Sequence, residues 1–497
     1  MASALRLLVA AALCGSISTH RAPPYRVRMD ASRGAAVDEL KRLRRASQWR
    51  QLLERFDALS AASPASVGAA CFAEAINAHS RLGDAEAALS LFHRMQRSGL
   101  HATLLTYTAA IRACATAQLW PVALSLLDDV RDEGIAPDTV LYNAALVACE
   151  RGAQWEEALL LLDEMRAAGP PPDAITFNTA ISTMARARRW QLALSLLEAM
   201  RTQQPPLAPD KYSFAAAISA CDRGEQPELA LDCLQRMHEA GIAPNVVAYN
   251  SAIRACATRT LWPVALSLFE DLKGDGVAPT VVTYNAALAA CERGGQWEEA
   301  VLLLDEMREA AIPPDTISFN TAIASCRTGG TMESSTTSLQ LLQRMANEGM
   351  KPNVITYTGV MSACIGAKRW RSALEVFEQL RRPSTAVVPD MVAYDAALLA
   401  CAGGGLWEES LHLLAAMRAQ NGCQPSEASY VYAADACRKA NQPKLEARLR
   451  TRALSMRGAG RLQLKRGSRI DDRLPRGNVS RNAKSKAAAA NRQNKLR

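Results

Sequence analysis

The chain has 497 residues, and its 58 Lys and Arg against 49 Asp and Glu give a net charge of +9. Hydrophobic residues make up 49% but aromatic residues only 5%, a balance that favours helices packed through small side chains and leaves little material for strands. Residues 438–497 hold 19 basic and 3 acidic side chains, whereas residues 69–426 hold 28 and 39, so the overall charge of the acidic body argues against a polyanion partner.

The first 32 residues have the composition of a targeting segment. Arg6 precedes an apolar run over Leu7–Cys14, Ser, Thr, Arg and Pro follow through Arg28, and no acidic residue occurs before Asp30. The run is too short to span a bilayer, so we expect a signal-like core with a basic stretch, or a single transit peptide, and no membrane partner. We expect an organellar protein, with a plastid favoured over a mitochondrion. A frayed N-terminus is the alternative.

A repeat of about 35 residues governs the rest of the chain. Successive tryptophans are separated by 71, 35, 35, 72, 35, 73 and 37 residues. They are Trp49, Trp120, Trp155, Trp190, Trp262, Trp297, Trp370 and Trp407. Self-similarity at this period is typical of stacked helical arrays, in which no repeat buries its apolar face alone. Residues 33–68 are expected to form a degenerate first repeat, and ten full repeats follow over 69–426.

Each repeat has the pattern of two antiparallel helices. In the third full repeat, Tyr142, Ala145, Leu146 and Cys149 have the spacing of one helix face, and a second apolar face begins at Trp155. A polar turn separates the two, and Gly and Pro end the second helix. The sequence therefore predicts an all-α fold, an α/α superhelical solenoid of helix-turn-helix repeats. The full repeats span residues 69–103, 104–138, 139–173, 174–210, 211–245, 246–280, 281–315, 316–353, 354–390 and 391–426.

Nine of the thirteen cysteines recur at one position of successive repeats. This recurrence favours a small buried core residue in a reducing compartment over a disulfide framework. No metal or other cofactor is expected, because the chain has no CxxC pair and only six His. The recurrent Trp is interpreted as packing between helices, in preference to a ligand-stacking residue. The nine are Cys114, Cys149, Cys221, Cys256, Cys291, Cys326, Cys364, Cys401 and Cys437.

The C-terminal part of the chain, after the full repeats, consists of two segments of different composition. Residues 427–454 continue the pattern as a partial repeat that caps the array. From residue 455 the sequence is rich in Gly, Arg, Lys, Ser and Asn, so we expect a disordered basic tail over 455–497. Nonspecific phosphate binding, nuclear import and a merely solubilising role are all compatible with such a tail.

The repeat "VVTYNAALAACERGGQWEEAVLLLDEMREAAIPPD" at residues 281–315 resembles the pentatricopeptide repeat of organellar RNA-binding proteins. Its Tyr-Asn start and Pro-Asp end recur, and the resemblance covers roughly residues 69–437. Tetratricopeptide repeats have a similar period, but their Trp-Leu-Gly-Tyr pattern lies in the first helix, whereas here Trp opens the second. The resemblance implies a right-handed superhelix whose first helices line a groove and bind single-stranded RNA, one base per repeat.

The resemblance also implies which residues read the bases, namely the fifth and the last residue of each repeat. In the parallel sense of the family, the pairs in this chain predict 5′-GUUN(C/U)UCG-3′. Ala215 removes one hydrogen-bonding partner, so its base is expected to go unread, and Ala73 with Thr103 and Asp395 with Ser426 depart from the usual pairs. The eight central pairs are Thr108 with Asp138, Asn143 with Asp173, Asn178 with Asp210, Ala215 with Asn245, Asn250 with Thr280, Asn285 with Asp315, Asn320 with Asn353, and Thr358 with Asp390.

Physical arguments bear on the same positions. Asn is disfavoured in a helix by roughly 0.5 kcal/mol against Ala, so its recurrence at the fifth position asks for a compensating role, and a side chain that both donates and accepts suits a base edge. The recurrent Asp is equally explained as a helix N-cap worth about 1 kcal/mol, and the two roles are compatible. Among the first fourteen residues of the repeats, basic residues such as Arg112, Arg186 and Arg254 outnumber acidic ones. The groove is therefore expected to be mildly positive.

No catalytic module is expected. A deaminase-like module would need H-x-E with P-C-x-x-C, but no His or Cys follows Cys437, and P-loop and GxGxxG patterns are missing. We predict a non-enzymatic, monomeric binder of a specific single-stranded RNA, acting in stabilisation, processing or translation, with a recruited RNA-processing enzyme as a further partner. The alternative is a helical-repeat scaffold for protein partners, which the acidic array favours.

Overall fold

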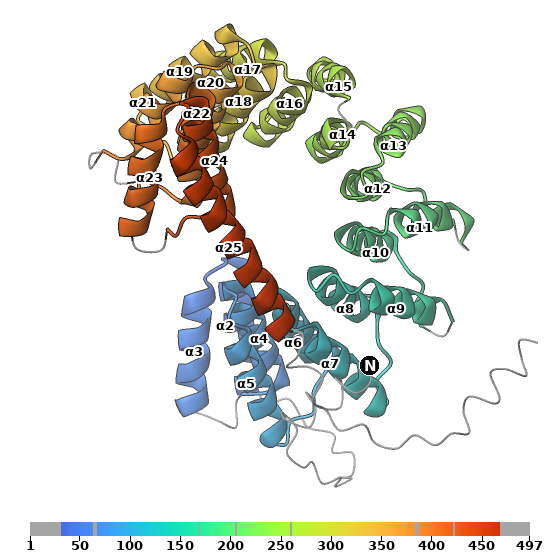
Figure 1. The fold of residues 1–497 in the computed structure, drawn as a ribbon. Helices are drawn as coiled ribbons and strands as arrows, with labels where there is room; N and C mark the ends of the chain where they lie inside the picture. The colour runs from blue at the N-terminus through green and yellow to red at the C-terminus, as the bar shows by residue number, and fades with distance from the viewer. Residues whose placement is uncertain are drawn as a thin grey trace, which may run out of the picture. The chain divides into compact units, whose positions relative to one another are not determined.

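The computed structural model describes residues 31–62, 67–167, 169–203, 206–258, 261–382, 387–420 and 423–467. Every regular element in these ranges is an α-helix, and consecutive helices form antiparallel pairs (Figure 1). The predicted all-α solenoid of helix-turn-helix repeats is therefore confirmed. No helix in these ranges combines the length and the apolarity needed to cross a bilayer.

The chain divides into two compact units, Met1–Ser318 and Phe319–Arg497, with the division in the first turn of one helix, α18. The helices of the first unit are α2 (Ala31–Arg45), α3 (Trp49–Ala62), α4 (Ala69–Leu82), α5 (Ala85–Arg97), α6 (Leu104–Thr116), α7 (Trp120–Asp132), α8 (Thr139–Arg151), α9 (Trp155–Ala167), α10 (Ala174–Arg186), α11 (Trp190–Thr202), α12 (Lys211–Arg223), α13 (Pro227–Glu239), α14 (Val246–Thr258), α15 (Trp262–Gly274), α16 (Val281–Gly294) and α17 (Trp297–Glu309). From α18 onwards they are α18 (Thr316–Gly329), α19 (Met332–Asn347), α20 (Val354–Gly366), α21 (Trp370–Leu380), α22 (Met391–Gly404), α23 (Trp407–Ala419), α24 (Glu427–Lys439) and α25 (Pro443–Gly467).

The turn between the two helices of a repeat has the same backbone conformation throughout the described repeats. Its central residue, the fifteenth of the repeat, has a positive φ, for example +52° at Ala153 and +67° at Gly295. Glycine adopts this left-handed conformation at little cost, whereas a residue with a Cβ is strained in it. Residues other than glycine hold it at Ser47, Gln118, Ala153, Arg188, Glu225, Lys368 and Asn441.

The recurrent tryptophans connect neighbouring repeats. Each opens a second helix, and four of them lie over a glycine near the end of the first helix in the following repeat. An added Cβ at Gly224 would lie 2.4 Å from Cδ1 of Trp190, and one at Gly152 would lie 2.5 Å from Cδ1 of Trp120. The interpretation of Trp as an inter-helix packing residue is confirmed at these sites. The other two pairs are Trp262 over Gly294 and Trp370 over Gly403.

The cysteines of the described ranges are buried and free, with no disulfide among them. Burial raises the pKa of Cys114 and of Cys291 to about 12, so both thiols stay protonated at neutral pH.

The fourth residue of the first helix packs in the same core. The Tyr284 ring lies 5.0 Å from the ring of Phe269 in the preceding repeat, and the Tyr284 hydroxyl donates to Glu306 at 3.0 Å.

The ends of the helical region differ from the expected segment limits. Helix α2 begins at Ala31, inside the segment assigned to targeting, and α25 continues to Gly467, beyond residue 454. The disorder expected from residue 455 is therefore wrong for 455–467, where the Arg-rich and Lys-rich sequence continues a helix. The rest of the expected targeting segment and basic tail, residues 1–30 and 468–497, lies outside the described residues.

Candidate nucleic-acid interface

The first helices carry large apolar side chains on their exposed face. In nine of the ten full repeats the second residue is Leu, Val, Ile or Tyr, and yet it is between 50% and 67% exposed. Residues 2 and 5 of a helix lie on one face, so this apolar side chain neighbours the fifth residue of its own repeat. The residues of this second-position set are Leu105, Val140, Ile175, Tyr212, Val247, Val282 and Ile317 in the first compact unit, and Ile355 and Val392 in the second.

The last residue of each full repeat caps the next first helix. Its side-chain oxygen accepts the backbone N–H three residues later, for example Leu141 N–H at Asp138 (2.8 Å) and Ala393 N–H at Asp390 (2.8 Å). The capping role expected for this residue is therefore present. The ten caps are Thr103, Asp138, Asp173, Asp210, Asn245, Thr280, Asp315, Asn353, Asp390 and Ser426.

Three of the Asn–Asp pairs are joined directly. Nδ2 of Asn143 donates to Oδ1 of Asp173 at 3.2 Å, and the corresponding distances are 3.2 Å for Asn178 with Asp210 and 3.4 Å for Asn285 with Asp315. The third residue of the following repeat closes the arrangement from the other side. Thr176, Ser213 and Ser318 donate their hydroxyls to Oδ1 of the same three asparagines at 2.6–2.7 Å.

In the pair Asn320 and Asn353, both amide oxygens are engaged inside the protein. Oδ1 of Asn320 accepts the Thr356 hydroxyl at 2.7 Å, and Oδ1 of Asn353 accepts the Thr356 N–H at 3.0 Å. Because the carbonyl side of each amide is committed to the protein, the pair offers chiefly N–H donors. An Asn–Asp pair instead offers carboxylate acceptors.

The remaining pairs are arranged differently. The hydroxyls of Thr108 and Thr358 donate to carbonyls of their own helices, at Leu104 (2.6 Å) and Val354 (2.9 Å). Asn250 is 8% exposed, and within the described residues its Oδ1 has no hydrogen-bond partner. Ala215 has no polar group to give to Asn245. The structure therefore joins the two members of a pair directly only in the three Asn–Asp cases among the eight predicted pairs of the described chain.

The hydrogen bonds act on the ionisation of the three Asp residues. Burial raises the pKa of Asp173, Asp210 and Asp315, but their hydrogen bonds from backbone N–H, hydroxyl and Asn amide groups outweigh it, and the net pKa lies below the usual value of 3.8. These carboxylates are therefore charged acceptors at neutral pH.

The outer pairs, which depart from the family pattern, also differ in structure. Asp395 stands at the fifth position, where it accepts the Ser429 hydroxyl at 2.5 Å and the Ser426 hydroxyl at 3.5 Å. At the other end, Ala73 is 2% exposed and Thr103 caps α6. Neither pair offers the combination of amide and carboxylate that the three Asn–Asp pairs have.

The positive charge of the first helices is partly neutralised within the array. Arg186 lies 3.3 Å from Glu150, and Arg254 lies 2.6 Å from Asp222, in each case in the preceding repeat. Arg112 is exposed. Of the three arginines named as examples of this positive charge, two are therefore ion-paired, and less free charge remains than the sequence indicated.

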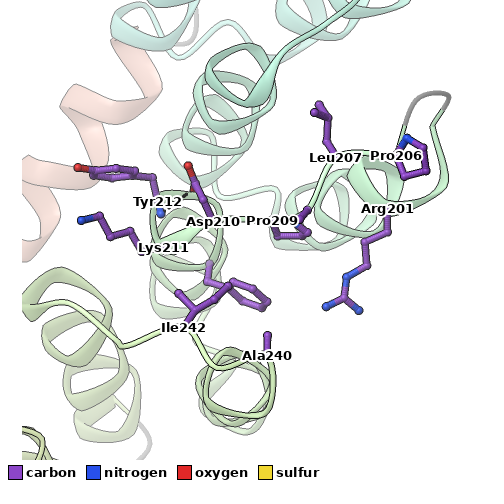
Figure 2. A pocket seen from close by; sticks show the side chains of 11 residues that line it. Arg201, Pro206, Leu207, Pro209, Asp210, Lys211, Tyr212, Ala240 and Ile242 are labelled. Carbon is purple, nitrogen blue, oxygen red and sulfur yellow. Dashed lines mark hydrogen bonds between the residues drawn. The ribbon is translucent and has the colours of Figure 1, made fainter.

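Two cavities meet at Tyr212. One, of about 470 Å³, lies along α10, α12 and α14 and is lined by second-position and fifth-position residues of successive repeats. The other, of about 840 Å³, lies between the loop before α12 and the end of α13. Figure 2 shows Tyr212 and Lys211 projecting to one side of α12, away from Pro206 and Arg201. No group of three His, Cys, Asp or Glu side chains in the described part of the chain could hold a metal ion.

Sequence reasoning missed the second-position set, although the pattern contains a signal for it. The second and fourth residues are both apolar, as in Val140 and Tyr142. Two residues apart on a helix they point in nearly opposite directions, so both cannot enter the same core. The structure buries Tyr142 and exposes Val140.

Comparisons with known proteins agree with this architecture. Models of the PPR repeat family match residues 137–186, 244–293 and 279–327, models of the pentatricopeptide repeat domain match 90–151, 203–259 and 340–404, and a PPR repeat model matches 75–100 and 175–204. No curated protein matches the sequence.

Solved structures supply the comparison of folds. The maize pentatricopeptide repeat protein PPR10 is 21% identical, with a TM-score of 0.54 over 94% of this chain and 73% of its own. PPR10 in complex with an 18-nt psaJ RNA element is 24% identical, with a TM-score of 0.41 over 85% of this chain and 59% of its own. Yeast Rmd9p in complex with a 16-nt target RNA is 11% identical, with a TM-score of 0.38 over 84% and 86%. On its family matches and its repeated helix pairs, the chain belongs to the pentatricopeptide repeat family.

Proposed function

We propose that this protein binds a specific single-stranded RNA through its repeats, one base per repeat, with the core sequence 5′-GUUN(C/U)UCG-3′. It acts in the RNA metabolism of an organelle, a plastid in preference to a mitochondrion. As a monomer without chemistry of its own, it would protect an RNA end, hold a hairpin open or guide a recruited processing enzyme.

One observation carries the proposal: polar pairs of defined hydrogen-bonding character lie beside exposed apolar side chains on one helix face. The cavity of about 470 Å³ brings them together, since Ile175 and Val247 line it with Asn178 and Asn245. An apolar side chain can cover the face of a base while a polar pair meets its edge, which is how single-stranded RNA is read by sequence. Membership of the pentatricopeptide repeat family supports the same function.

The hydrogen bonds inside the pairs give a physical reason for the base string. Uracil presents an N3–H donor on its Watson–Crick edge, which suits the carboxylate of Asp173, Asp210 or Asp315. Cytosine presents N3 as an acceptor, which suits the amide N–H groups of Asn320 and Asn353. A mismatch sets donor against donor or acceptor against acceptor, and an unpaired buried polar group costs about 1–3 kcal/mol.

The test is a fluorescence-anisotropy titration of the full-length protein with RNA containing GUUNCUCG, a scrambled RNA and the equivalent DNA, over a range of salt concentrations. We expect a preference of about tenfold or more, ~1.4 kcal/mol, for the RNA that contains the core. A matched protein lacking residues 468–497 separates base reading from attraction to the basic tail, and it should keep the preference.

Binding that ignores sequence and vanishes with the tail would refute RNA reading by the repeats. It would favour the scaffold instead, for which the exposed acids of the second helices, such as Asp128, Glu156 and Glu298, are the observation to follow. Affinity capture with variants of these acids would then locate the protein partner.

A further inference from the structure

The repeat over residues 211–245 differs from its neighbours in two ways at one place. Its fifth residue is Ala215, where the repeats on either side have Asn178 and Asn250, and its second residue is the aromatic Tyr212. Both side chains line the cavity of about 470 Å³. The base opposite this repeat would otherwise be unread, since one member of the polar pair is missing.

Of the predicted pair of this repeat, only the last residue, Asn245, has a polar side chain. Oδ1 of Asn245 accepts the N–H of Ala248 at 2.9 Å, so the carbonyl side of this amide is committed to capping α14. Its Nδ2 has no hydrogen-bond partner within the described residues, and the fifth residue of its own repeat, Ala215, has no amide. Asn245 therefore presents N–H donors to the cavity, and a ligand at that edge has to supply an acceptor.

Tyr212 supplies a flat surface at the same place. It is 59% exposed and is the one aromatic residue among the described second-position residues. Its backbone N–H is fixed by Oδ1 of Asp210 at 2.9 Å, and Nζ of Lys211 lies 5.3 Å from the centre of its ring (Figure 2). Aromatic side chains in this setting stack on nucleobases, and a two-ring base gains more contact than a single ring.

Size and hydrogen bonding then select the base. Ala215 lines the cavity with a methyl group where the flanking repeats have an Asn, and the smaller side chain leaves more room for a purine. Adenine has an acceptor at N1, whereas guanine has an N1–H that would oppose the N–H donors of Asn245. We propose that the repeat over residues 211–245 selects adenine at the fourth base, stacked on Tyr212 and read by Asn245, so that the core becomes 5′-GUUA(C/U)UCG-3′. This inference rests on the proposed RNA-binding function.

The experiment compares four RNAs that differ only at the fourth base, titrated with the full-length protein. We expect the adenine RNA to bind about tenfold more tightly than the uracil RNA. In Tyr212→Val, which places the side chain of the following repeat (Val247) at this position, the ratio should fall below about twofold. In Tyr212→Phe it should be retained, because stacking does not need the hydroxyl.

A spectroscopic signal reports the stacking directly. RNA with 2-aminopurine at the fourth base should lose fluorescence on binding the wild-type protein and Tyr212→Phe, and much less on binding Tyr212→Val. Ala215→Asn offers a second check, since it recreates the pair of Asn320 with Asn353 and should move the preference at the fourth base from adenine to cytosine.

The outcomes separate this inference from the function on which it rests. Equal affinity for all four bases, or a preference for guanine or a pyrimidine, would overturn the adenine site if uracil is still preferred over cytosine at the sixth base. Loss of preference at the fourth and the sixth base together would overturn the RNA-reading function, and the adenine site with it.

Discussion

The side-chain amide of Asn178 donates to Oδ1 of Asp210 at 3.2 Å, although 32 residues separate the two in sequence. The same carboxylate accepts the N–H of Ser213, and the Ser213 hydroxyl returns to Oδ1 of Asn178. One Asp thus caps a helix, holds an Asn and remains partly exposed. Cap and proposed base reader are two uses of the same side chain.

Exchanging Asp for Asn at the last position should change the base that is read and leave the fold intact. Asn353 already caps α20 as Asp315 caps α18, so Asp315→Asn keeps a good cap. It replaces an acceptor with donors, and we expect the sixth base to change from uracil to cytosine. Anisotropy with RNAs that differ only at the sixth base measures the ratio, which should invert from about tenfold in favour of uracil to about tenfold in favour of cytosine.

The reciprocal variant Asn353→Asp is the matched control, and it should move the seventh base from cytosine to uracil without affecting the sixth. If each variant weakened binding to all RNAs equally, the last residue would be a helix cap alone.

Acid should remove a part of the stability that the Asn–Asp pairs contribute. The pKa values of Asp173, Asp210 and Asp315 are lower in the folded chain than the usual 3.8. The resulting stabilisation is fully present above that usual value and is lost as the pH falls through the lower folded pKa. In a variant with Asn at all three positions, the melting temperature should therefore fall by less between about pH 5 and pH 2 than it does in the wild type.

Asp57, which is exposed, provides the comparison for this measurement, since Asp57→Asn removes one carboxylate that has no such network. It should keep the acid dependence of the wild type. Identical acid curves for the wild type and the triple variant would contradict the linkage.

Filling a glycine beneath a tryptophan should destabilise the array. In Gly224→Ala the new Cβ would meet Trp190 Cδ1 at 2.4 Å and Cγ at 2.9 Å, so the indole ring has to shift. Overpacking of this kind costs about 1–3 kcal/mol. Thermal unfolding followed by tryptophan fluorescence and circular dichroism should show a lower melting temperature.

Gly274→Ala is the control for this change, because no atom lies within 4 Å of the added Cβ at the end of α15. It should leave the protein as stable or up to ~1 kcal/mol more stable. Equal losses in the two variants would mean that the Trp–Gly contact does not set the cost.

Relieving the strained turns should stabilise the protein. Ala153 holds a φ of +52°, which glycine adopts without strain, so Ala153→Gly should gain about 0.5–1 kcal/mol after the added entropy of the unfolded chain is included. Ala187 lies one position earlier in its repeat with a φ of −80°, and Ala187→Gly should lose stability instead. A lower melting temperature for Ala153→Gly than for the wild type would contradict this account of the turn.

The features that could be predicted from the sequence are those set within a single repeat and by the length of the repeat. Trp155 and Trp190 are the first residues of second helices, and Asp138 and Asp390 cap first helices. These positions could be predicted because the signals for them, a Trp that recurs at one position of the repeat and a Pro-Asp before an apolar run, lie within a few residues of the helix start. The all-α solenoid follows from repetition of these signals. The role of the fifth and last residues in binding RNA stays a prediction.

What the sequence did not predict depends on contacts between repeats. The partners of Arg186 and Arg254 lie 36 and 32 residues earlier, so counting charges on first helices overstated the free positive charge. The unpaired Oδ1 of Asn250 has a similar origin, because the hydroxyl of Thr283, at the position whose hydroxyl bonds Oδ1 in the Asn–Asp pairs, pairs with the Thr280 hydroxyl at 3.1 Å instead. The helix over 455–467 was missed because its Gly residues disfavour a helix and its few apolar residues form no periodic face, although Arg, Lys and Leu are themselves good helix formers.

The hydrogen bonds between Asn178, Asp210 and Ser213 affect how repeats of this kind can be recombined in an engineered protein. A block cut at the helix starts separates the Asn and Asp from the hydroxyl that orients them, and it also parts Trp190 from Gly224. The segment that has to travel together runs from the fifth residue of one repeat to the fourteenth of the next. This segment is longer than one repeat, so the segments of two neighbouring repeats overlap and have to be compatible in sequence where they do. Repeats with new base specificities therefore cannot be combined independently of their neighbours.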